Sequence, residues 1–119
     1  MNPEMSQEIQ QCLQNCLDCH RLCLETAMHC LPGSGLLRGE QAEAGHIRLL
    51  LDCAEICQTS ANFLLRGSDL HTLTCAVCAE ICDLCAVECE RVEDAAMQAC
   101  AETCRRCAAT CAAMAETQV

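Results

Sequence analysis

Small apolar residues, mostly cysteines, recur along this chain at alternating steps of three and four residues. The segment Cys75–Cys89, which reads CAVCAEICDLCAVEC, shows the pattern most clearly, with cysteines at positions 75, 78, 82, 85 and 89. Steps of three and four residues place side chains on one face of an α-helix. The pattern therefore predicts a helix whose buried face carries thiols where a soluble bundle would carry Leu and Ile.

The same spacing recurs elsewhere in the chain. Cysteines stand at positions 12, 16, 19 and 23 and again at 100, 104, 107 and 111, and a shorter version covers Cys53 and Cys57. Each of these segments is also predicted to be helical, with its thiols on the buried face. No segment has the alternating pattern of a β-strand.

Local signals between these segments predict where each helix begins and ends. Asn2 can cap a first helix that has Pro3 at its first position, and residues 31–35, LPGSG, form the clearest break. Gly67 is predicted to end the second helix, and Ser68 or Asp69 to cap the third. The last break is placed near residues 91–94, where the cysteine phase resets. The predicted helices cover about residues 3–30, 39–66, 69–91 and 94–116 of a single domain spanning residues 1–119.

Four helices with short connections predict an all-α fold, an antiparallel up-down-up-down four-helix bundle with a cysteine-lined core. This topology decides which residues meet at each end of the bundle. One end is predicted to gather Cys30, His46, Cys89, Met97 and Cys100. The other end is predicted to gather Cys12, Phe63, Leu64, His71, Cys75, Cys111 and Met114.

The composition shows that this core is unusual. The 119-residue chain has 16 cysteines but one Phe and no Trp or Tyr. A core of this size normally depends on aromatic side chains. We therefore expect something other than protein to fill or bind the interior.

The charge and the N-terminus exclude several classes of partner. A formal net charge of -10 argues against nucleic acid and against anionic membrane surfaces. The first residues, MNPEMSQEIQQ, lack the basic and apolar regions of a secretory signal, and no apolar run is long enough to span a bilayer. The expected location is therefore the cytoplasm.

Many cysteines in a cytosolic chain favour metal binding over disulfides. Cβ atoms four residues apart on a helix are about 5–6 Å apart, whereas a disulfide needs about 3.8 Å. A Cys-x-x-x-Cys pair on a helix is therefore better shaped to hold a metal ion between two thiolates. Seven such pairs can be read directly: Cys12/Cys16, Cys19/Cys23, Cys53/Cys57, Cys78/Cys82, Cys85/Cys89, Cys100/Cys104 and Cys107/Cys111. Cys30 and Cys75 remain, and Cys75 has His71 four residues before it.

Cu(I) is the metal that this arrangement favours. Thiolates are soft ligands that suit Cu(I), zinc and iron–sulfur clusters, but zinc and iron–sulfur sites usually draw on cysteines in loops. One Cu(I) per cysteine would also neutralise the buried thiolates, which predicts a capacity on the order of ten to twenty ions per chain. Loading should release protons from the thiols.

Helices that carry inward Cys-x-x-x-Cys pairs in this number and phase resemble the bacterial copper storage proteins, over nearly the whole chain. The lack of a leader resembles the cytosolic branch of that family. The resemblance implies a bundle that fills its core with Cu(I) bound by the seven pairs, usually assembled as a homotetramer. It also implies storage or sequestration rather than enzymatic turnover. We expect a copper chaperone as a donor or recipient.

Further ligands are predicted at the ends of the bundle. His46 and Met97 share the inward phase at the Cys30 end and would suit a site where Cu(I) enters, whereas Cys75 would pair with His71 or with a neighbouring helix. An apolar plug of Phe63, Leu64, Leu65, Leu70 and Leu73 is expected to close the far end. The sequence favours packing rather than ligand roles for Met28 and Met114, and solvated or interface roles for His20 and His29. An apolar stripe of Leu13, Leu17, Leu24, Ile47 and Leu51 would serve either lateral helix packing or a subunit contact.

Two alternatives remain open at this point. One is a zinc or cadmium buffer like a metallothionein, which would fold around its metal. The other is a thiol redox protein that uses a Cys-x-x-Cys such as Cys16/Cys19, although none of these motifs follows a strand as a thioredoxin-like site requires.

Overall fold

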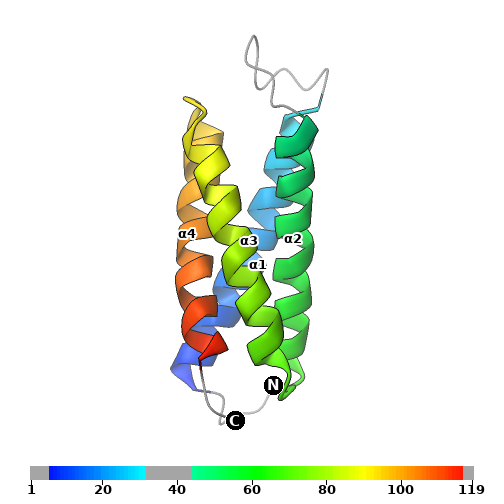
Figure 1. The fold of residues 1–119 in the computed structure, drawn as a ribbon, viewed down its shortest axis with the longest axis vertical. Coiled ribbons are helices and arrows are strands. Elements are labelled where there is room, and N and C mark those ends of the chain that lie inside the picture. The colour runs from blue at the N-terminus through cyan, green and yellow to red at the C-terminus, as the bar shows by residue number, and fades with distance from the viewer. Residues whose placement is uncertain (1–5, 32–43, 117–119) are drawn as a thin grey trace.

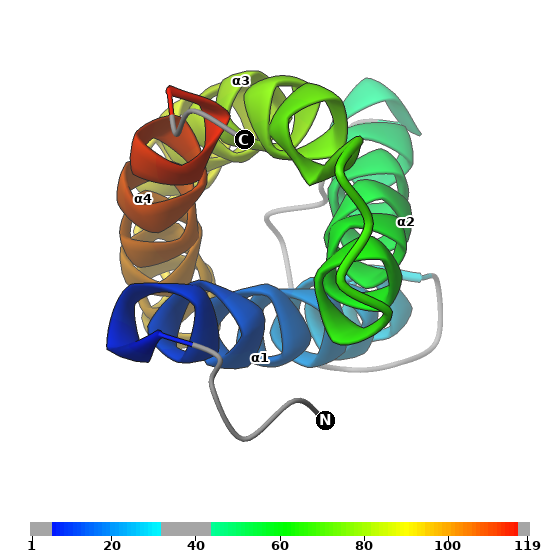
Figure 2. The same cartoon turned by 90° about the horizontal axis from the view of Figure 1, so that it is seen from below.

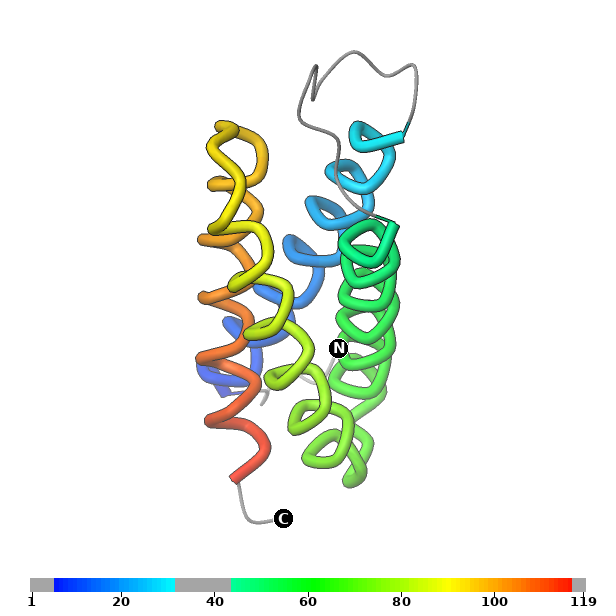
Figure 3. Tube along the Cα trace, turned by 45° about the horizontal axis from the view of Figure 1, so that its top comes forward, coloured from blue at the N-terminus to red at the C-terminus, as the bar shows by residue number. Residues whose placement is uncertain are grey.

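The computed structural model describes residues 6–31 and 44–116. These residues form four α-helices, α1 (Gln7–His29), α2 (Ala44–Leu65), α3 (His71–Glu90) and α4 (Ala95–Ala115) (Figure 1). Successive helices run in opposite directions, and each packs against two neighbours, so that the four close into a ring around one axis (Figures 2 and 3). The predicted all-α four-helix bundle is confirmed.

The first helix begins at Gln7. The hydroxyl of Ser6 accepts a hydrogen bond from the Ile9 backbone N–H at 3.2 Å, which satisfies one of the unpaired donors of the first turn. The predicted start at Asn2 and Pro3, most of the predicted break at 31–35 and the predicted start of the second helix near residue 39 lie outside the described residues.

The α2–α3 turn depends on Gly67, which has a φ of 66°. The Ser68 N–H bonds to the Phe63 carbonyl at 3.0 Å and the Gly67 N–H to the Leu64 carbonyl at 3.1 Å, the two bonds of a Schellman motif. The prediction for the next cap was wrong in position. Leu70 occupies the N-cap of α3 and makes no side-chain cap bond, while Ser68, two residues before it, accepts the Leu70 N–H with its hydroxyl at 3.0 Å.

The α3–α4 connection lies at Arg91–Asp94, and Asp94 is the N-cap of α4. Its carboxylate accepts the backbone N–H groups of Ala96 and Met97 at 2.9 and 3.1 Å. A carboxylate at this position also suits the positive end of the helix dipole.

Alanines line the seams between the helices. Buried alanines recur seven residues apart on three helices, at Ala54 and Ala61, Ala79 and Ala86, and Ala101 and Ala108. Their small side chains let neighbouring helices approach closely, while the thiols fill the space along the axis. No described helix has the combination of length and apolar character that a membrane crossing needs.

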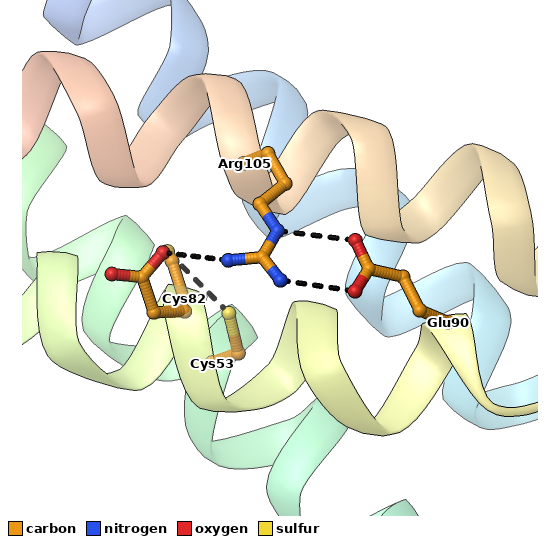
Figure 4. Close-up of polar contacts among 5 residues, drawn as sticks. Cys53, Cys82, Glu90 and Arg105 are labelled. Atoms are coloured by element: carbon orange, nitrogen blue, oxygen red, sulfur yellow. Dashed lines mark hydrogen bonds and ion pairs between the residues drawn. The ribbon is translucent and has the colours of Figure 1, made fainter.

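An exposed ion-pair network joins α3 to α4 above the Cys53–Cys82 contact (Figure 4). The Arg105 guanidinium donates to both Glu90 carboxylate oxygens at 2.9 and 3.1 Å, and to Asp83 at 3.3 Å. The arginine lowers the pKa of the Glu90 carboxyl. Exposed pairs contribute little stability, so this network mainly helps to fix the register of the two helices.

Candidate metal centre

All sixteen cysteines are free and buried. Every one has no exposed surface except Cys30, which is 9% exposed. Burial of this many thiols along one axis follows from the three-and-four spacing, which turns each cysteine face toward the centre of the ring.

Sulfur atoms from different helices meet at the axis. Cys19 is the clearest case, because its Sγ lies 3.8 or 3.9 Å from four other sulfurs on all four helices: Cys23, Cys53, Cys82 and Cys104. Within single helices, the predicted pairs that lie within 4.0 Å are Cys19/Cys23, Cys78/Cys82 and Cys107/Cys111. The other close sulfur contacts cross between helices, so the core is a shared column rather than a set of separate clamps.

Five groups of thiols have sulfur atoms that all lie within 4.8 Å of one another. Neighbouring groups share members, and together they run along most of the axis. The groups are Cys19/Cys23/Cys53/Cys104, Cys19/Cys53/Cys57/Cys82, Cys57/Cys78/Cys82/Cys107, Cys16/Cys78/Cys107/Cys111 and Cys12/Cys75/Cys111. Soft thiolates gathered in this way suit Cu(I).

The end of the bundle near His46 is built differently. The His46 Nε2 atom lies 3.4 Å from Cys89 Sγ, and Met97 is fully buried. Cys100 extends the column through a 3.7 Å contact with Cys23. Among the described residues, the cysteines outside the five groups all belong to this end or adjoin it: Cys30, Cys85, Cys89 and Cys100.

The opposite end brings Cys75 to Cys12 and Cys111 rather than to His71. The His71 Nδ1 atom lies 2.8 Å from the Ser68 carbonyl oxygen, and its Nε2 atom is buried with no hydrogen-bond partner. His71 therefore lies at the predicted end, but it belongs to none of the thiol groups.

The predicted apolar plug at this end was largely wrong. Leu64 is buried and Phe63 half-buried, with the Arg66 guanidinium 4.8 Å from its ring centroid. By contrast, Leu65, Leu70 and Leu73 are 46%, 57% and 64% exposed. Leu73 points away from the core because it lies two residues before the inward Cys75, about half a helical turn around.

Several residues have roles that the sequence did not assign. The His20 Nδ1 atom lies 2.7 Å from the Ala54 carbonyl oxygen, so this half-buried side chain joins α1 to α2. Met114 is buried, whereas Met28 and His29 are exposed. Sequence reasoning missed Ser60, which is fully buried and whose hydroxyl has no hydrogen-bond partner. Its place three residues after Cys57 on the inward face was the signal.

Contacts with neighbouring sulfurs lower the pKa of some core thiols, such as Cys19 and Cys78, whereas burial and other sulfur contacts raise the pKa of others. Contacts with Cys100, Cys104 and Cys19, together with burial, raise the pKa of the Cys23 thiol. Burial and the nearby charge of Asp94 raise the pKa of Cys30. A metal ion that binds to the thiols with a raised pKa must therefore displace protons.

The match to known proteins agrees with this site. The family model described as "Copper storage protein" matches residues 5–116. The chain belongs to the copper storage protein family. The predicted membership of this family is thus confirmed, and its members store metal rather than catalyse a reaction.

Solved structures resemble this copper storage protein over most of its length. A crystal structure of a protein from Nitrosospira multiformis is 48% identical, with a TM-score of 0.82, and covers 93% of this chain and 97% of that one. Cu(I)-bound copper storage protein BsCsp3 is 34% identical, with a TM-score of 0.80, over 92% of this chain and 99% of its own. Apo copper storage protein 3 from Bacillus subtilis is 33% identical, with a TM-score of 0.77, over 89% and 97%.

A curated relative is similar in sequence. The uncharacterized cysteine-rich protein YhjQ of Bacillus subtilis (strain 168) is 34% identical over 85 residues, which cover 71% of this chain and 75% of that protein. The predicted function of copper storage is confirmed at the level of the family.

Proposed function

We propose that this copper storage protein sequesters many Cu(I) ions in the cytoplasm by binding them to the thiolates of its core. The observation that carries the proposal is the column of buried thiols, in which each group shares sulfur atoms with the next. The Cu(I)-bound state of BsCsp3, a 34% identical relative, supports the choice of metal.

The proposed ligands are the sixteen cysteines. Because the thiolates can bridge neighbouring ions, one Cu(I) per thiolate would leave the core close to neutral, which favours a capacity on the order of ten to twenty ions per chain. The proposed ligand set is Cys12, Cys16, Cys19, Cys23, Cys30, Cys53, Cys57, Cys75, Cys78, Cys82, Cys85, Cys89, Cys100, Cys104, Cys107 and Cys111.

We place the uptake of Cu(I) at the His46 end. His46 is 8% and Cys30 9% exposed, so a thiol lies close to the surface there, whereas at the opposite end Cys12 and Cys75 are fully covered and, of the possible ligands, only His71 and Met114 keep some exposed surface. The His46–Cys89 contact and the buried thioether of Met97 would pass the ion to the column. At the far end, His71 would have to turn its unpartnered Nε2 toward Cys75 to act as a ligand.

The partners proposed for this chain are copies of itself and a copper chaperone. Family resemblance favours a homotetramer. The stripe of exposed apolar residues on α3, defined as Leu73, Val77, Leu84 and Val87, is a suitable contact because such surface is costly to leave in water.

Titration separates storage from the alternatives. The reduced apo protein is titrated with Cu(I) against a strong competing chelator, and the titration is repeated with Zn(II). Storage predicts many Cu(I) ions per chain that the chelator does not remove. Weak Cu(I) binding beside tight binding of a few Zn(II) ions would contradict it. A disordered apo chain in circular dichroism would favour a metallothionein-like protein instead.

A further inference from the structure

We propose that the apo core also binds two divalent ions per chain, of the class of Zn(II), Cd(II) or Co(II), in preformed tetrathiolate cages. The inference deepens the proposed function, because it concerns the same thiols and a competing metal. Divalent ions of this class take four thiolates in a tetrahedron, whereas Cu(I) accepts fewer.

The first cage consists of Cys57, Cys78, Cys82 and Cys107, from α2, α3 and α4. Five of its six sulfur–sulfur distances are 3.6, 3.7, 3.8, 3.9 and 4.0 Å, and the sixth is within 4.8 Å. A regular tetrahedron around an ion with metal–sulfur bonds of about 2.3 Å has edges of about 3.8 Å. The apo sulfurs therefore already stand close to the positions of a tetrahedral site.

The second cage consists of Cys19, Cys23, Cys53 and Cys104, from α1, α2 and α4. Four of its sulfur–sulfur distances are 3.6, 3.8, 3.8 and 3.9 Å. It shares no residue with the first cage, so both can be filled at once. In both cages the protein supplies all four ligands as cysteine sulfurs, and all eight thiols are fully buried.

The number two follows from the overlap between groups. The remaining four-thiol groups, Cys19/Cys53/Cys57/Cys82 and Cys16/Cys78/Cys107/Cys111, each share a pair of sulfurs with a neighbouring cage. Ions in two tetrahedra that share an edge would lie only about 2.7 Å apart for bonds of about 2.3 Å. Repulsion between two divalent charges at that distance opposes simultaneous filling. Two of the four-thiol groups at most can therefore be filled at once, and the fifth group, Cys12/Cys75/Cys111, offers three thiols rather than four.

The charge of the filled cages predicts that divalent ions bind less tightly than Cu(I). One divalent ion bound by four thiolates leaves a buried cage with a net charge of −2. Matched Cu(I) and thiolates are neutral, so the desolvation penalty is smaller. Cu(I) should therefore displace the divalent ions. The exchange transfers no electrons, because the thiolates stay in place and each metal keeps its oxidation state.

Cobalt is the probe for the test. Reduced apo full-length protein is titrated with Co(II) without oxygen, and thiolate-to-metal charge transfer and the visible bands of tetrahedral Co(II) are followed. The expected saturation is two Co(II) per chain, and added Cu(I) should release both. Absence of the tetrahedral thiolate spectrum, or saturation at another number, would overturn the proposal.

Variants locate the cages. Cys107→Ser removes one cage and one overlapping group, so the remaining thiols hold one Co(II) instead of two. Cys89→Ser is the matched control, because it removes a thiol outside the cages and should leave the Co(II) number at two. Circular dichroism checks folding, and Cys78→Ser, which removes the same two groups, replaces Cys107→Ser if that variant does not fold. Equal losses in the control and cage variants would contradict the assignment.

The outcome is separable from that of the proposed function. A protein that binds many Cu(I) ions but no Co(II) would retain the storage role and lose the cages. A protein that binds two Co(II) tightly and Cu(I) weakly would keep the cages and lose the storage role.

Discussion

Ser60 lies on the inward face of α2, between Cys53 and Leu64, and its hydroxyl makes no hydrogen bond. It follows Cys57 by three residues, is fully buried, and its hydroxyl has no partner. A buried hydroxyl without a hydrogen bond costs free energy, on the order of 1–3 kcal/mol. Helix α2 contributes fewer sulfurs to the column than its neighbours partly because serine stands here.

Ser60→Cys should therefore raise the copper capacity. The new thiol would continue the Cys53 and Cys57 face, and we expect about one additional chelator-resistant Cu(I) per chain, by the one-ion-per-thiolate balance. The measurement is Cu(I) titration of both proteins against the same chelator. Asn62→Cys is the control, because it adds a thiol on the exposed face of α2. An equal gain in both variants would show that the extra copper is not in the core.

Protonation of the thiols predicts how binding depends on pH. The raised pKa values of Cys23 and Cys30 mean that these thiols hold their protons near pH 7. For Cys75, the contact with Cys111 favours the thiolate, but contact with Cys12 and burial outweigh it and raise the pKa to about 12. Cu(I) that binds to these thiols must expel their protons, so its apparent affinity should rise with pH.

For one proton per ion, the apparent dissociation constant should fall about tenfold for each unit by which the pH rises below these pKa values. Competition titrations at several pH values, corrected for protonation of the chelator, measure the slope. A flat profile would mean that these thiols are already ionised in the apo protein, which would contradict their raised pKa values.

At the scale of the elements, the cysteine spacing was sufficient to predict four helices and the direction in which each faces. The spacing could not reveal the caps, because a cap depends on one or two backbone angles. The third helix starts at His71 after an uncapped Leu70 although Ser68 and Asp69 are the better capping residues by type. The alanine seams were also missed, since alanine is common and its pattern is faint beside that of cysteine.

Gly67 offers a test at this scale. Its φ of 66° is unfavourable for a residue with a Cβ, so Gly67→Ala should lower the free energy of unfolding by about 1 kcal/mol. Gly45→Ala is the control, because Gly45 lies in the first turn of α2 and an added Cβ would meet nothing within 4 Å. That change should raise stability by up to about 1 kcal/mol.

Chemical denaturation of the apo protein, followed by circular dichroism, measures both changes. Two substitutions of the same type with opposite signs would show that backbone conformation, not the added methyl group itself, decides the effect. If Gly67→Ala were neutral, the left-handed turn would not be important for stability.

For the whole molecule, the bundle could be predicted because its topology follows from short connections. The contacts between sulfurs could not, because they depend on the axial stagger of the helices, which the sequence does not specify. Thus His46 was correctly brought to Cys89, but the choice for Cys75 between His71 and a neighbouring helix stayed open until the structure placed it beside Cys12 and Cys111. The plug failed because Leu70 lies in the α2–α3 turn, where it is 57% exposed, and because Leu73 faces away from the inward Cys75.

The exposed stripe on α3 predicts how copies of the chain associate. Leu73 and Leu84 are 64% and 59% exposed, so replacing both with Glu should disrupt an oligomer without disturbing the core. Light scattering of the purified protein should show a shift toward the monomer mass. The matched control, Leu24→Glu with Leu51→Glu, alters the less exposed apolar residues of α1 and α2. Dissociation in the control alone would move the contact to those helices.

The central claim is that copper fills the axis of the bundle, bound by thiolates. The most direct measurement is anomalous diffraction at the copper edge from crystals of the Cu(I)-loaded protein. We predict a continuous row of copper peaks between the four helices, on the order of ten to twenty per chain, each beside cysteine sulfurs. Copper confined to one or two sites, or bound on the surface while the core thiols remain metal-free, would contradict the account.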